Sequence, residues 1–515
     1  MIPPLSPKRR FLKISALLTG VLASAAPLCA EIKVASPFTS HMVLQRDLPV
    51  PVWGWAEPGE AVKVEFAGQA KAANAGPDGK WRVDLGPLTA SAEGRAMTVG
   101  GSMTATPVVL DDVLVGEVWI GSGQSNMAFT MSKSVSSWAG VENEEREIAA
   151  ADYPAIRMFT AEPIRADAPQ ATVPGQWLVC SPETAPGFSA VGYYFARGLH
   201  RELKVPVGIV TLAYGASCAQ AWVRREAIVA DPTLKPTLDA YDEAVKKHTP
   251  PTEEELAAWR AAVEKAKAEN KRPPGEPKPH PSQDQHNPTV LFNGVVAPVI
   301  PFSVRGVIWY QGESITKPLE LFPTWNRTLI QDWRALWGRE LPFYFCQLAA
   351  QDKKSNSPEV RAMQAEALSL PNTAMAVTVD IGDRTNVHPH NKLDVGERLA
   401  RIALARSYGR DIEYSGPQFA EAAIEAGAIR VKFSHAGGLA AKGGPPKTFE
   451  VAGADGKYVP AEATIDGSSV VVRATTVAGP VSVRYAWANY PEGANLYNDA
   501  ALPAVPFRAE NLKAR

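Results

Sequence analysis

The segment "VWIGSGQSNMAF", residues 118–129, contains the strongest indication of fold and chemistry in this chain. An apolar run of strand character ends at two glycines and is followed at once by Ser125, between Gln124 and Asn126. Such a strand end is typical either of a turn built from small polar residues or of a nucleophile held at a sheet edge. The α/β-hydrolase elbow has Gly-x-Ser-x-Gly, and position 127 is methionine, so that elbow is disfavoured.

Length and composition indicate a globular protein of several domains. The chain has 515 residues, of which 45% are hydrophobic and 21% are charged, and its formal net charge is −1. This length exceeds what one ordinary hydrophobic core supports. The charge balance lacks the basic footprint of a nucleic-acid binder, so we expect no nucleic-acid partner.

Residues 1–30 are typical of an export signal. "PKRRFLK" forms a basic region, "ISALLTGVLASAA" an apolar region, and small residues precede Glu31. The apolar run is too short to cross a bilayer as a stable helix, and no later apolar window is long enough to do so. We therefore expect a periplasmic or extracellular protein with no membrane partner, the alternative being a cytoplasmic first helix.

The mature chain divides into three parts. Residues 31–112 and 411–515 show strand alternation between turn signals, for example in "KWRVDL" at 80–85, and predict two β domains of sandwich type. Residues 113–410 alternate apolar strands with helices, for example the helix predicted over 190–203. That pattern predicts an α/β domain whose parallel sheet is covered on both faces. Its five predicted strands are 113–121, 205–215, 304–312, 341–349 and 373–382.

An insertion over about residues 232–290 interrupts the α/β pattern. "TEEELAAWRAAVEKAKAEN" at 252–270 predicts a helix that begins with a capping box between Thr252 and Glu255. A Pro- and Lys-rich stretch follows it. The two interpretations are a solvated flap and a lid over a substrate groove.

Three cysteines remain once the export signal is removed. Cys180, Cys218 and Cys346 match no metal-binding spacing. We expect buried thiols, with a Cys180–Cys218 disulfide as the alternative in an oxidising compartment.

His388 is the histidine best placed to serve Ser125 as a base. It lies in "DIGDRTNVHPHNK" at 380–392, directly after the last predicted strand of the sheet. The carboxyl ends of parallel strands share one edge, so this loop should emerge beside Ser125. A metal pair of His388 with His390 is the alternative, but no further ligands follow at zinc-like spacing, and we expect neither metal nor organic cofactor.

Five segments together resemble the sialate O-acetylesterase family of SGNH-type esterases. The resemblance implies an SGNH (flavodoxin-like) three-layer α/β/α domain over 113–410, and removal of O-acetyl groups from carbohydrates. It also implies an acyl-enzyme and an acetylated sugar or polysaccharide as substrate. The segments are "GQSNM" (123–127), "FSAVGYYFAR" (188–197), "VRGVIWYQGES" (304–314), "DIGDRTNVHPHNK" (380–392) and "GANLYNDAALPAVPFR" (493–508).

The resemblance also implies roles for individual residues. Ser125 becomes the nucleophile and His388 the general base, while the backbone N–H groups of Ser125 and Gly215 become oxyanion donors. Where the family usually has Trp-Gly-Gly, this chain has Tyr214-Gly215-Ala216. We expect Gln311 to donate as well, because a neutral amide can donate to a developing negative charge and an ionised carboxylate cannot.

The group that orients His388 is less well defined. SGNH enzymes generally place an aspartate three residues before the histidine, where this chain has Thr385. We expect Asp383 to take the role. Asp380 and a backbone carbonyl remain open as alternatives.

The sequence leaves the substrate open between sialic acid and a plant-wall polysaccharide such as xyloglucan or xylan. A non-catalytic carbohydrate-binding or adhesion protein with a decayed hydrolase domain is the alternative function. Sialic acid carries a carboxylate that calls for an arginine, and sugar rings pack on aromatic side chains. The candidates are Arg157, Arg224, Arg225 and Arg384 for the carboxylate, and Trp138, Trp222, Trp309 and Tyr310 for the sugar.

Overall fold

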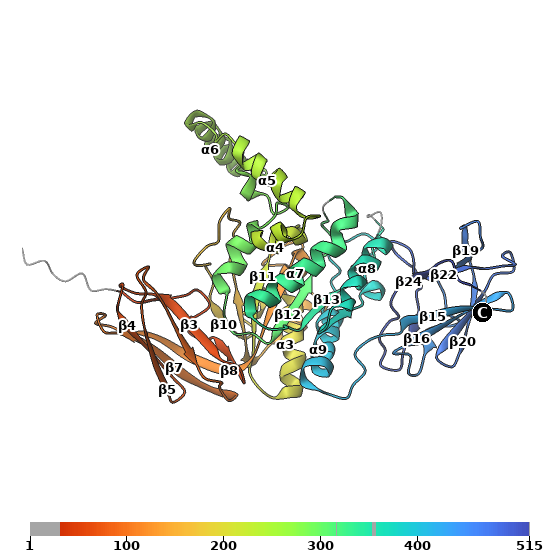
Figure 1. Cartoon of the computed structure of the whole chain (residues 1–515), viewed down its shortest axis with the longest axis horizontal. Helices are drawn as coiled ribbons and strands as arrows, with labels where there is room; N and C mark the ends of the chain where they lie inside the picture. Colours follow the sequence, from red (N-terminus) through yellow and green to blue (C-terminus); the bar gives the residue numbers. More distant parts are fainter. Residues whose placement is uncertain (1–30, 316, 353–356, 514–515) are drawn as a thin grey trace, which may run out of the picture.

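The computed structural model describes residues 31–315, 317–352 and 357–513. The export signal predicted over 1–30 lies outside these residues. Figure 1 shows an elongated molecule in which a central α/β unit lies between an N-terminal and a C-terminal β unit. The α/β class expected from the sequence is confirmed.

A largely parallel sheet forms the centre of the molecule. Its strand order is β10-β9-β11-β8-β12-β13-β14, and all neighbours are parallel except β10 and β9. The middle strands are almost wholly buried, as expected for a sheet covered on both faces. Their bounds are β8 Val108–Gly123, β9 Tyr153–Thr160, β10 Trp177–Cys180, β11 Val207–Ala213, β12 Gly306–Tyr310, β13 Phe343–Cys346 and β14 Thr373–Ala376.

Helices cover both faces of this sheet. Helices α3 (Ala190–Leu203) and α9 (Lys392–Tyr408) pack together on one face, whereas α7 (Phe322–Trp337) and α8 (Ser357–Ala365) belong to the other. Helix α3 has the predicted bounds because Ser189 caps it, with its Oγ accepting from the Gly192 N–H at 3.1 Å.

The N-terminal β unit is continuous with the central sheet. Strand β8 pairs with β7 and β2 in its first half and with β11 and β12 in its second half. The boundary predicted after residue 112 therefore falls inside a strand, and apolar residues of both units form one cluster. The other strands of this unit are β1 Lys33–Val34, β2 Val43–Gln45, β3 Val50–Trp55, β4 Ala61–Phe66, β5 Gln69–Asn74, β6 Lys80–Leu85 and β7 Ser91–Gly101.

The C-terminal β unit has a hydrophobic core of its own. Two four-stranded sheets, β15-β16-β21-β20 and β19-β18-β22-β24, enclose an apolar cluster around Val451, Val470 and Val483. The bounds are β15 Gln418–Glu425, β16 Ala428–Ser434, β17 Ala440–Ala441, β18 Phe449–Ala452, β19 Tyr458–Pro460, β20 Glu462–Asp466, β21 Ser469–Arg473, β22 Ser482–Tyr485, β23 Leu496–Tyr497 and β24 Phe507–Ala509.

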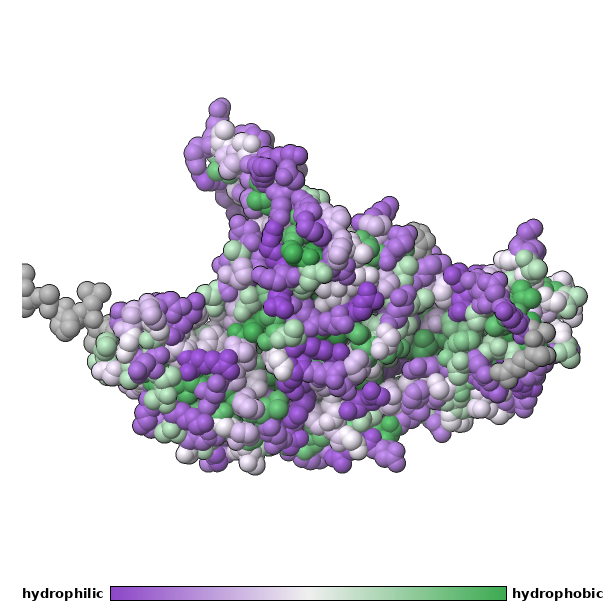
Figure 2. Space-filling view, viewed as in Figure 1, coloured by the Kyte–Doolittle hydropathy of each residue, from purple (hydrophilic) through white to green (hydrophobic). Residues whose placement is uncertain are grey.

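The insertion forms an arm that projects away from the central sheet. Helices α5 (Lys235–Lys247) and α6 (Glu253–Ala268) extend outward in Figure 1, and their surface is mainly hydrophilic in Figure 2. The predicted capping box is present, with Thr252 Oγ1 accepting from the Glu255 N–H and the Glu255 carboxylate accepting from the Thr252 N–H. No residue of α6 is buried, which favours the solvated flap over the lid.

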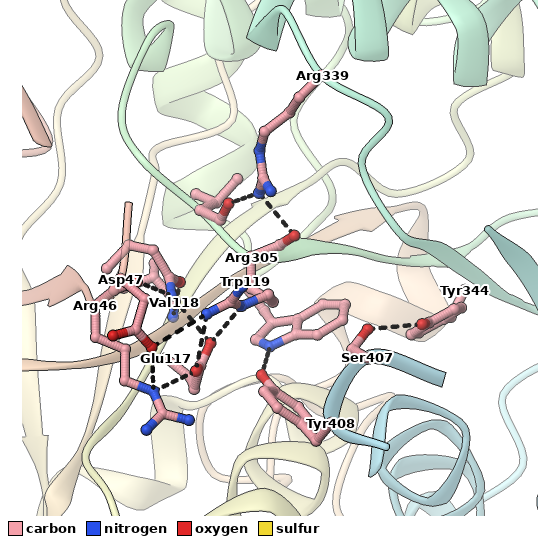
Figure 3. Close-up of polar contacts among 12 residues, drawn as sticks. Arg46, Asp47, Glu117, Val118, Trp119, Arg305, Arg339, Tyr344, Ser407 and Tyr408 are labelled. Carbon is pink, nitrogen blue, oxygen red and sulfur yellow. Dashed lines mark hydrogen bonds and ion pairs between the residues drawn. The ribbon is translucent and has the colours of Figure 1, made fainter. Parts of the chain in front are cut away.

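An ionic cluster lies at the amino end of the parallel strands. Glu117 of β8 is wholly buried and accepts hydrogen bonds from Arg46 at 2.6 Å, Arg305 at 2.9 Å and Gln45 at 3.0 Å (Figure 3). Burial by itself raises the pKa of Glu117, but the contacts from the two arginines outweigh it, so the net pKa is lowered. This cluster joins the N-terminal β unit to the start of β12.

The three cysteines are buried thiols, as expected, and the alternative Cys180–Cys218 disulfide is wrong. Burial raises the pKa of Cys180 to about 12, which keeps this thiol protonated and unreactive. Among the described helices, none is both long and apolar enough to cross a bilayer.

Candidate active site

Ser125 lies at the carboxyl end of the central strand, at the start of the short helix α1 (Ser125–Ala128). The preceding Gly123 has φ +131°, and a Cβ there would approach the Tyr310 carbonyl oxygen to 2.1 Å. Only glycine fits so close to β12 in this conformation. The tight strand end therefore brings Ser125 to the sheet edge, as the sequence predicted.

The structure brings His388 to Ser125. The His388 Nε2 lies 2.8 Å from the Ser125 Oγ, across 263 positions of sequence. Trp138 packs against the imidazole with ring centroids 4.7 Å apart, and 40% of Trp138 is exposed. A hydroxyl, an imidazole in hydrogen-bond range and an exposed aromatic ring thus share one surface position.

Of the predicted oxyanion donors, Gly215 is close to the serine and Gln311 is not available. A Cβ on Gly215 would lie 3.8 Å from the Ser125 Cβ, so this backbone passes beside the hydroxyl. Ala216, where the family usually has glycine, has φ +56°. The Gln311 amide donates to the Ser217 carbonyl at 3.2 Å and to the Ser314 carbonyl at 2.5 Å. Both amide hydrogens are used in holding loops, which corrects the expectation that Gln311 donates to an oxyanion.

Neither aspartate expected to orient His388 contacts its ring. Asp383 Oδ1 accepts from the backbone N–H groups of Thr385 and Asn386, both at 2.8 Å, and these bonds lower its pKa. Asp380 forms a two-pronged ion pair with Arg398, both distances being 2.7 Å. Within the described ranges, no carboxylate bonds to the His388 Nδ1, so the expected Asp383–His388 contact is not found.

A buried polar network lies directly beneath the serine and the histidine. Asn126, next to Ser125, donates to the Glu313 carboxylate at 2.5 Å and to the Val387 carbonyl at 3.1 Å. Lys392, the first residue of α9, donates to the Asn126 side-chain oxygen at 2.7 Å and to the Pro389 carbonyl at 2.6 Å. The two carbonyls flank His388. The network therefore ties the serine turn to the histidine loop.

The environment shifts the pKa values of two basic groups. Burial, with smaller contributions from the charges of Lys392 and His390, lowers the pKa of His388 to about 4. Burial also lowers the pKa of Lys392 to about 7, although Glu313 opposes the shift. The imidazole is consequently neutral near pH 7 and able to accept a proton.

The structure distinguishes buried from exposed residues among the aromatic candidates and shows a partner for each candidate arginine. Trp222, Trp309 and Tyr310 are core residues, which leaves Trp138 as the exposed ring of that set. Each candidate arginine already contacts a carboxylate. The pairs are Arg157 with Asp112, Arg224 with Asp332, Arg225 with Asp242, and Arg384 with Asp352 and Glu492.

Sequence reasoning assigned no role to Asn126 or Lys392. Both lie within the quoted motifs, one directly after Ser125 and the other four residues after His388. Their closeness in sequence to Ser125 and His388 is the signal from which a role could have been predicted. His390, the possible metal partner, instead bonds to the Gly140 carbonyl. No group of three or more His, Cys, Asp or Glu side chains suited to a metal ion occurs among the residues that the structure describes.

Comparisons with known proteins agree on one chemistry. The family model for sialic acid-specific acetylesterases, a group of carbohydrate esterases, matches residues 293–405. Sialate O-acetylesterase of Mus musculus is 28% identical, with 93% of this chain and 94% of that protein covered. The Homo sapiens protein is 27% identical, with 93% and 92% covered. A crystal structure of a carbohydrate acetylesterase from Xanthomonas citri is 33% identical, covers 93% of this chain and 100% of its own, and gives a TM-score of 0.78.

The fold, the serine–histidine pair and these relatives define a class, the carboxylic ester hydrolases that deacetylate carbohydrates. Within that class, the chain belongs to the sialate O-acetylesterase family. It is therefore a carbohydrate O-acetylesterase, and the alternative of a non-catalytic binding protein is set aside.

Proposed function

We propose that this chain is a serine esterase that removes O-acetyl groups from carbohydrates through an acetyl-enzyme, with Ser125 as nucleophile and His388 as general base. The observation that carries the proposal is the 2.8 Å contact between the Ser125 Oγ and the His388 Nε2. That distance is within the range required for proton transfer.

In the first half of the reaction, His388 takes the Ser125 proton as the Oγ attacks the acetyl carbonyl. The tetrahedral intermediate collapses when His388 returns that proton to the sugar oxygen, which leaves as an alcohol. In the second half, His388 takes a proton from water, the hydroxide attacks the acetyl-enzyme, and the proton returns to Ser125 as acetate leaves.

The backbone N–H groups of Ser125 and Gly215 are the proposed oxyanion donors. Each such donor typically contributes about 3 kcal/mol of transition-state stabilisation. His388 acts without a carboxylate partner in this scheme. Its loop is held instead by the Asp383 turn and by the contacts of Asn126 and Lys392 with the flanking carbonyls.

For the substrate, we favour a neutral acetylated plant-wall sugar, such as that of xylan or xyloglucan, over sialic acid. All four candidate arginines already hold carboxylates, so binding a sialic acid carboxylate to any of these four would require breaking an ion pair. Trp138 offers an exposed ring beside His388 on which a sugar face can pack.

The proposal also includes the domain organisation and the cellular location of the protein. We assign the central unit to the SGNH layout, with β units on either side at roughly the predicted positions. Export to the periplasm or beyond follows from the basic and apolar pattern of residues 1–30.

Mass spectrometry of the enzyme during turnover of 4-nitrophenyl acetate tests the mechanism. We expect an acetyl adduct on the peptide that contains Ser125, and loss of both adduct and turnover in Ser125→Ala. For His388→Ala, we expect turnover to fall roughly a thousandfold. Full activity of Ser125→Ala would refute the proposal. Acetate release from acetylated xylan and from 9-O-acetyl sialic acid, measured side by side, decides the substrate.

A further inference from the structure

A groove with a cavity volume of about 780 Å³ crosses the C-terminal β unit. It runs between β18 and β20 on one side and the segment 487–492 on the other. Aromatic rings, prolines and acids make up much of its lining, including Trp487, Tyr490, Pro445, Pro446, Pro460 and Glu462. This composition suits a sugar chain, since apolar rings pack on C–H faces while polar groups bond to hydroxyls.

The two half-buried rings of the groove are held in place by arginines. The Arg508 guanidinium lies over Trp487 at 4.8 Å from the ring centroid, and that of Arg384 lies over Tyr490 at 4.5 Å. A ring that is already fixed loses little conformational entropy when a ligand packs on it. The groove is therefore preorganised.

The charges around the groove are balanced, which favours a neutral ligand. Glu450, Glu462 and Glu492 line the groove beside Lys447, and two of the three carboxylates pair with arginines. Carboxylates accept hydrogen bonds from sugar hydroxyls. Arg484 and Arg384 hold two of these carboxylates at 2.7 and 2.8 Å, which fixes their positions.

One residue connects the groove with the histidine loop. Arg384 contacts both Tyr490 and Glu492 of the groove, and it precedes His388 by only four residues. Four residues span at most about 14 Å, which limits the distance between the backbones of Arg384 and His388. Arg361 further anchors the groove segment by donating to the Ala488 and Asn489 carbonyls at 2.8 and 2.7 Å.

We propose that this groove is a second carbohydrate site, which binds a neutral sugar chain and so holds a polymeric substrate while Ser125 attacks its acetyl groups. The groove shares no lining residue with the Ser125, His388 and Trp138 site, so we take the substrates that use both places to be oligosaccharides or polysaccharides. The groove assists catalysis only if Ser125 and His388 act as proposed above, but its binding of sugar is independent of them.

The test uses the full-length chain and the variant Trp487→Ala. We expect the KM for acetylated xylan to rise about tenfold, because an aromatic contact with the chain is lost, while kcat and KM for 4-nitrophenyl acetate stay unchanged. Trp259→Ala, which removes a half-buried tryptophan from the projecting arm, is the matched control and should change neither. Thr464→Arg, which fills the groove from an exposed position on β20, provides a second variant should Trp487→Ala fold poorly.

Calorimetric titration with xylohexaose separates the groove from the chemistry. The wild-type protein should bind it, Thr464→Arg should bind at least tenfold more weakly, and an oligomer of sialic acid should not compete. Unchanged xylan kinetics and unchanged titration in both groove variants would overturn the proposal. Failure of the catalytic scheme would give a different result. The wild type would then show no turnover, while Thr464→Arg would still weaken the binding of xylohexaose.

Discussion

Two buried charged clusters lie at opposite ends of the parallel part of β8, which pairs with β11 and β12, and their charges are compensated differently. At the amino end of this part, the buried carboxylate of Glu117 contacts Arg46 and Arg305, and its pKa is lowered (Figure 3). At the carboxyl end, the ammonium of Lys392 is completely buried, contacts an amide and a carbonyl, and has its pKa lowered to about 7. The first cluster favours its charged form, and the second disfavours it.

The difference indicates what each cluster contributes. Glu117 joins the N-terminal β unit to β12, so its contacts hold the fold together. Lys392 is placed at the first turn of α9, where the helix dipole also disfavours a cation. The buried Lys392 ammonium, whose charged form is disfavoured, lies close to Ser125 and His388. Its placement there indicates a role in positioning the site rather than in stability.

The largest expected effect follows removal of the carboxylate charge in Glu117→Gln. We expect the free energy of unfolding to fall by about 3 kcal/mol, because removing one partner of a buried ion pair leaves the other uncompensated. Urea denaturation measures this change, and turnover of 4-nitrophenyl acetate below the transition should stay near the wild-type value.

Asp84→Asn is the control for this prediction, because it breaks the half-exposed pair of Arg82 with Asp84. No measurable change in stability is expected there. An unchanged midpoint for Glu117→Gln, or a selective loss of turnover, would remove the contrast between the Glu117 cluster and the Lys392 cluster.

Much of the fold could be predicted from the sequence because its signals are local. The cap at Ser189 sets the start of α3, and the Thr252–Glu255 box sets the start of α6. Strands β9 and β10 were missed, since β10 has only four residues and is defined by its pairing with β9. The continuity of β8 across residue 112 was missed because a strand shared by two units shows no break in sequence.

The same distinction, between local signals and contacts of distant segments, applies to the residues of the site. Ser125 and His388 were predictable because parallel strands end at one edge, and the structure places them in contact. Asp383 was misplaced because "DRTN" already satisfies its carboxylate locally, by the backbone N–H groups two and three residues on. The directions of the Gln311 amide and the Lys392 ammonium depend on burial between distant loops, which no local pattern reveals.

The next largest effect is expected for Lys392→Met, which replaces the buried ammonium with an apolar chain of similar length. We expect kcat for 4-nitrophenyl acetate to fall roughly tenfold to a hundredfold, because the loops of Asn126 and Pro389 lose their shared donor and the reactive pair shifts. The free energy of unfolding should fall as well, because the Asn126 and Pro389 oxygens lose their donor and Glu313 loses a nearby buried cation, so the loss of kcat is the distinguishing measurement.

Lys442→Met is the matched control. The Lys392 ammonium lies 4.5 Å from the centroid of the Phe129 ring, and Lys442 likewise lies over an aromatic ring, that of Tyr497, but on the surface. Its kcat should equal the wild-type value. A Lys392→Met protein with full kcat but a lowered unfolding midpoint would make this cluster structural, like that of Glu117.

A smaller effect is expected on the pH dependence. The base must be neutral, so kcat/KM of the wild type should lose activity only as pH falls toward the His388 pKa of about 4. Lys392, whose pKa is about 7, is charged near pH 4 and contributes to the lowering of the His388 pKa. In Lys392→Met the acidic limb should therefore move to higher pH, as measured with 4-nitrophenyl acetate between pH 3.5 and 7. A limb at the same pH in both proteins would show that Lys392 does not contribute to the low pKa of His388.

The smallest effect is expected at a contact of the C-terminal β unit with the central unit. The Tyr497 hydroxyl donates to Asp380 at 3.2 Å, and Asp380 also pairs with Arg398. This carboxylate is compensated as Glu117 is, so it should contribute to stability rather than to rate. For Tyr497→Phe, we expect the free energy of unfolding to fall by about 1 kcal/mol, the net value of one hydrogen bond, with kcat unchanged.

Tyr458→Phe is the control, because the Tyr458 hydroxyl contacts Glu510 on the surface, and it should leave both the free energy of unfolding and kcat unchanged. A loss of kcat in Tyr497→Phe without a loss of stability would contradict this view. A carboxylate compensated by a cation would then affect catalysis, so charge compensation would not distinguish a structural cluster from one that positions the site.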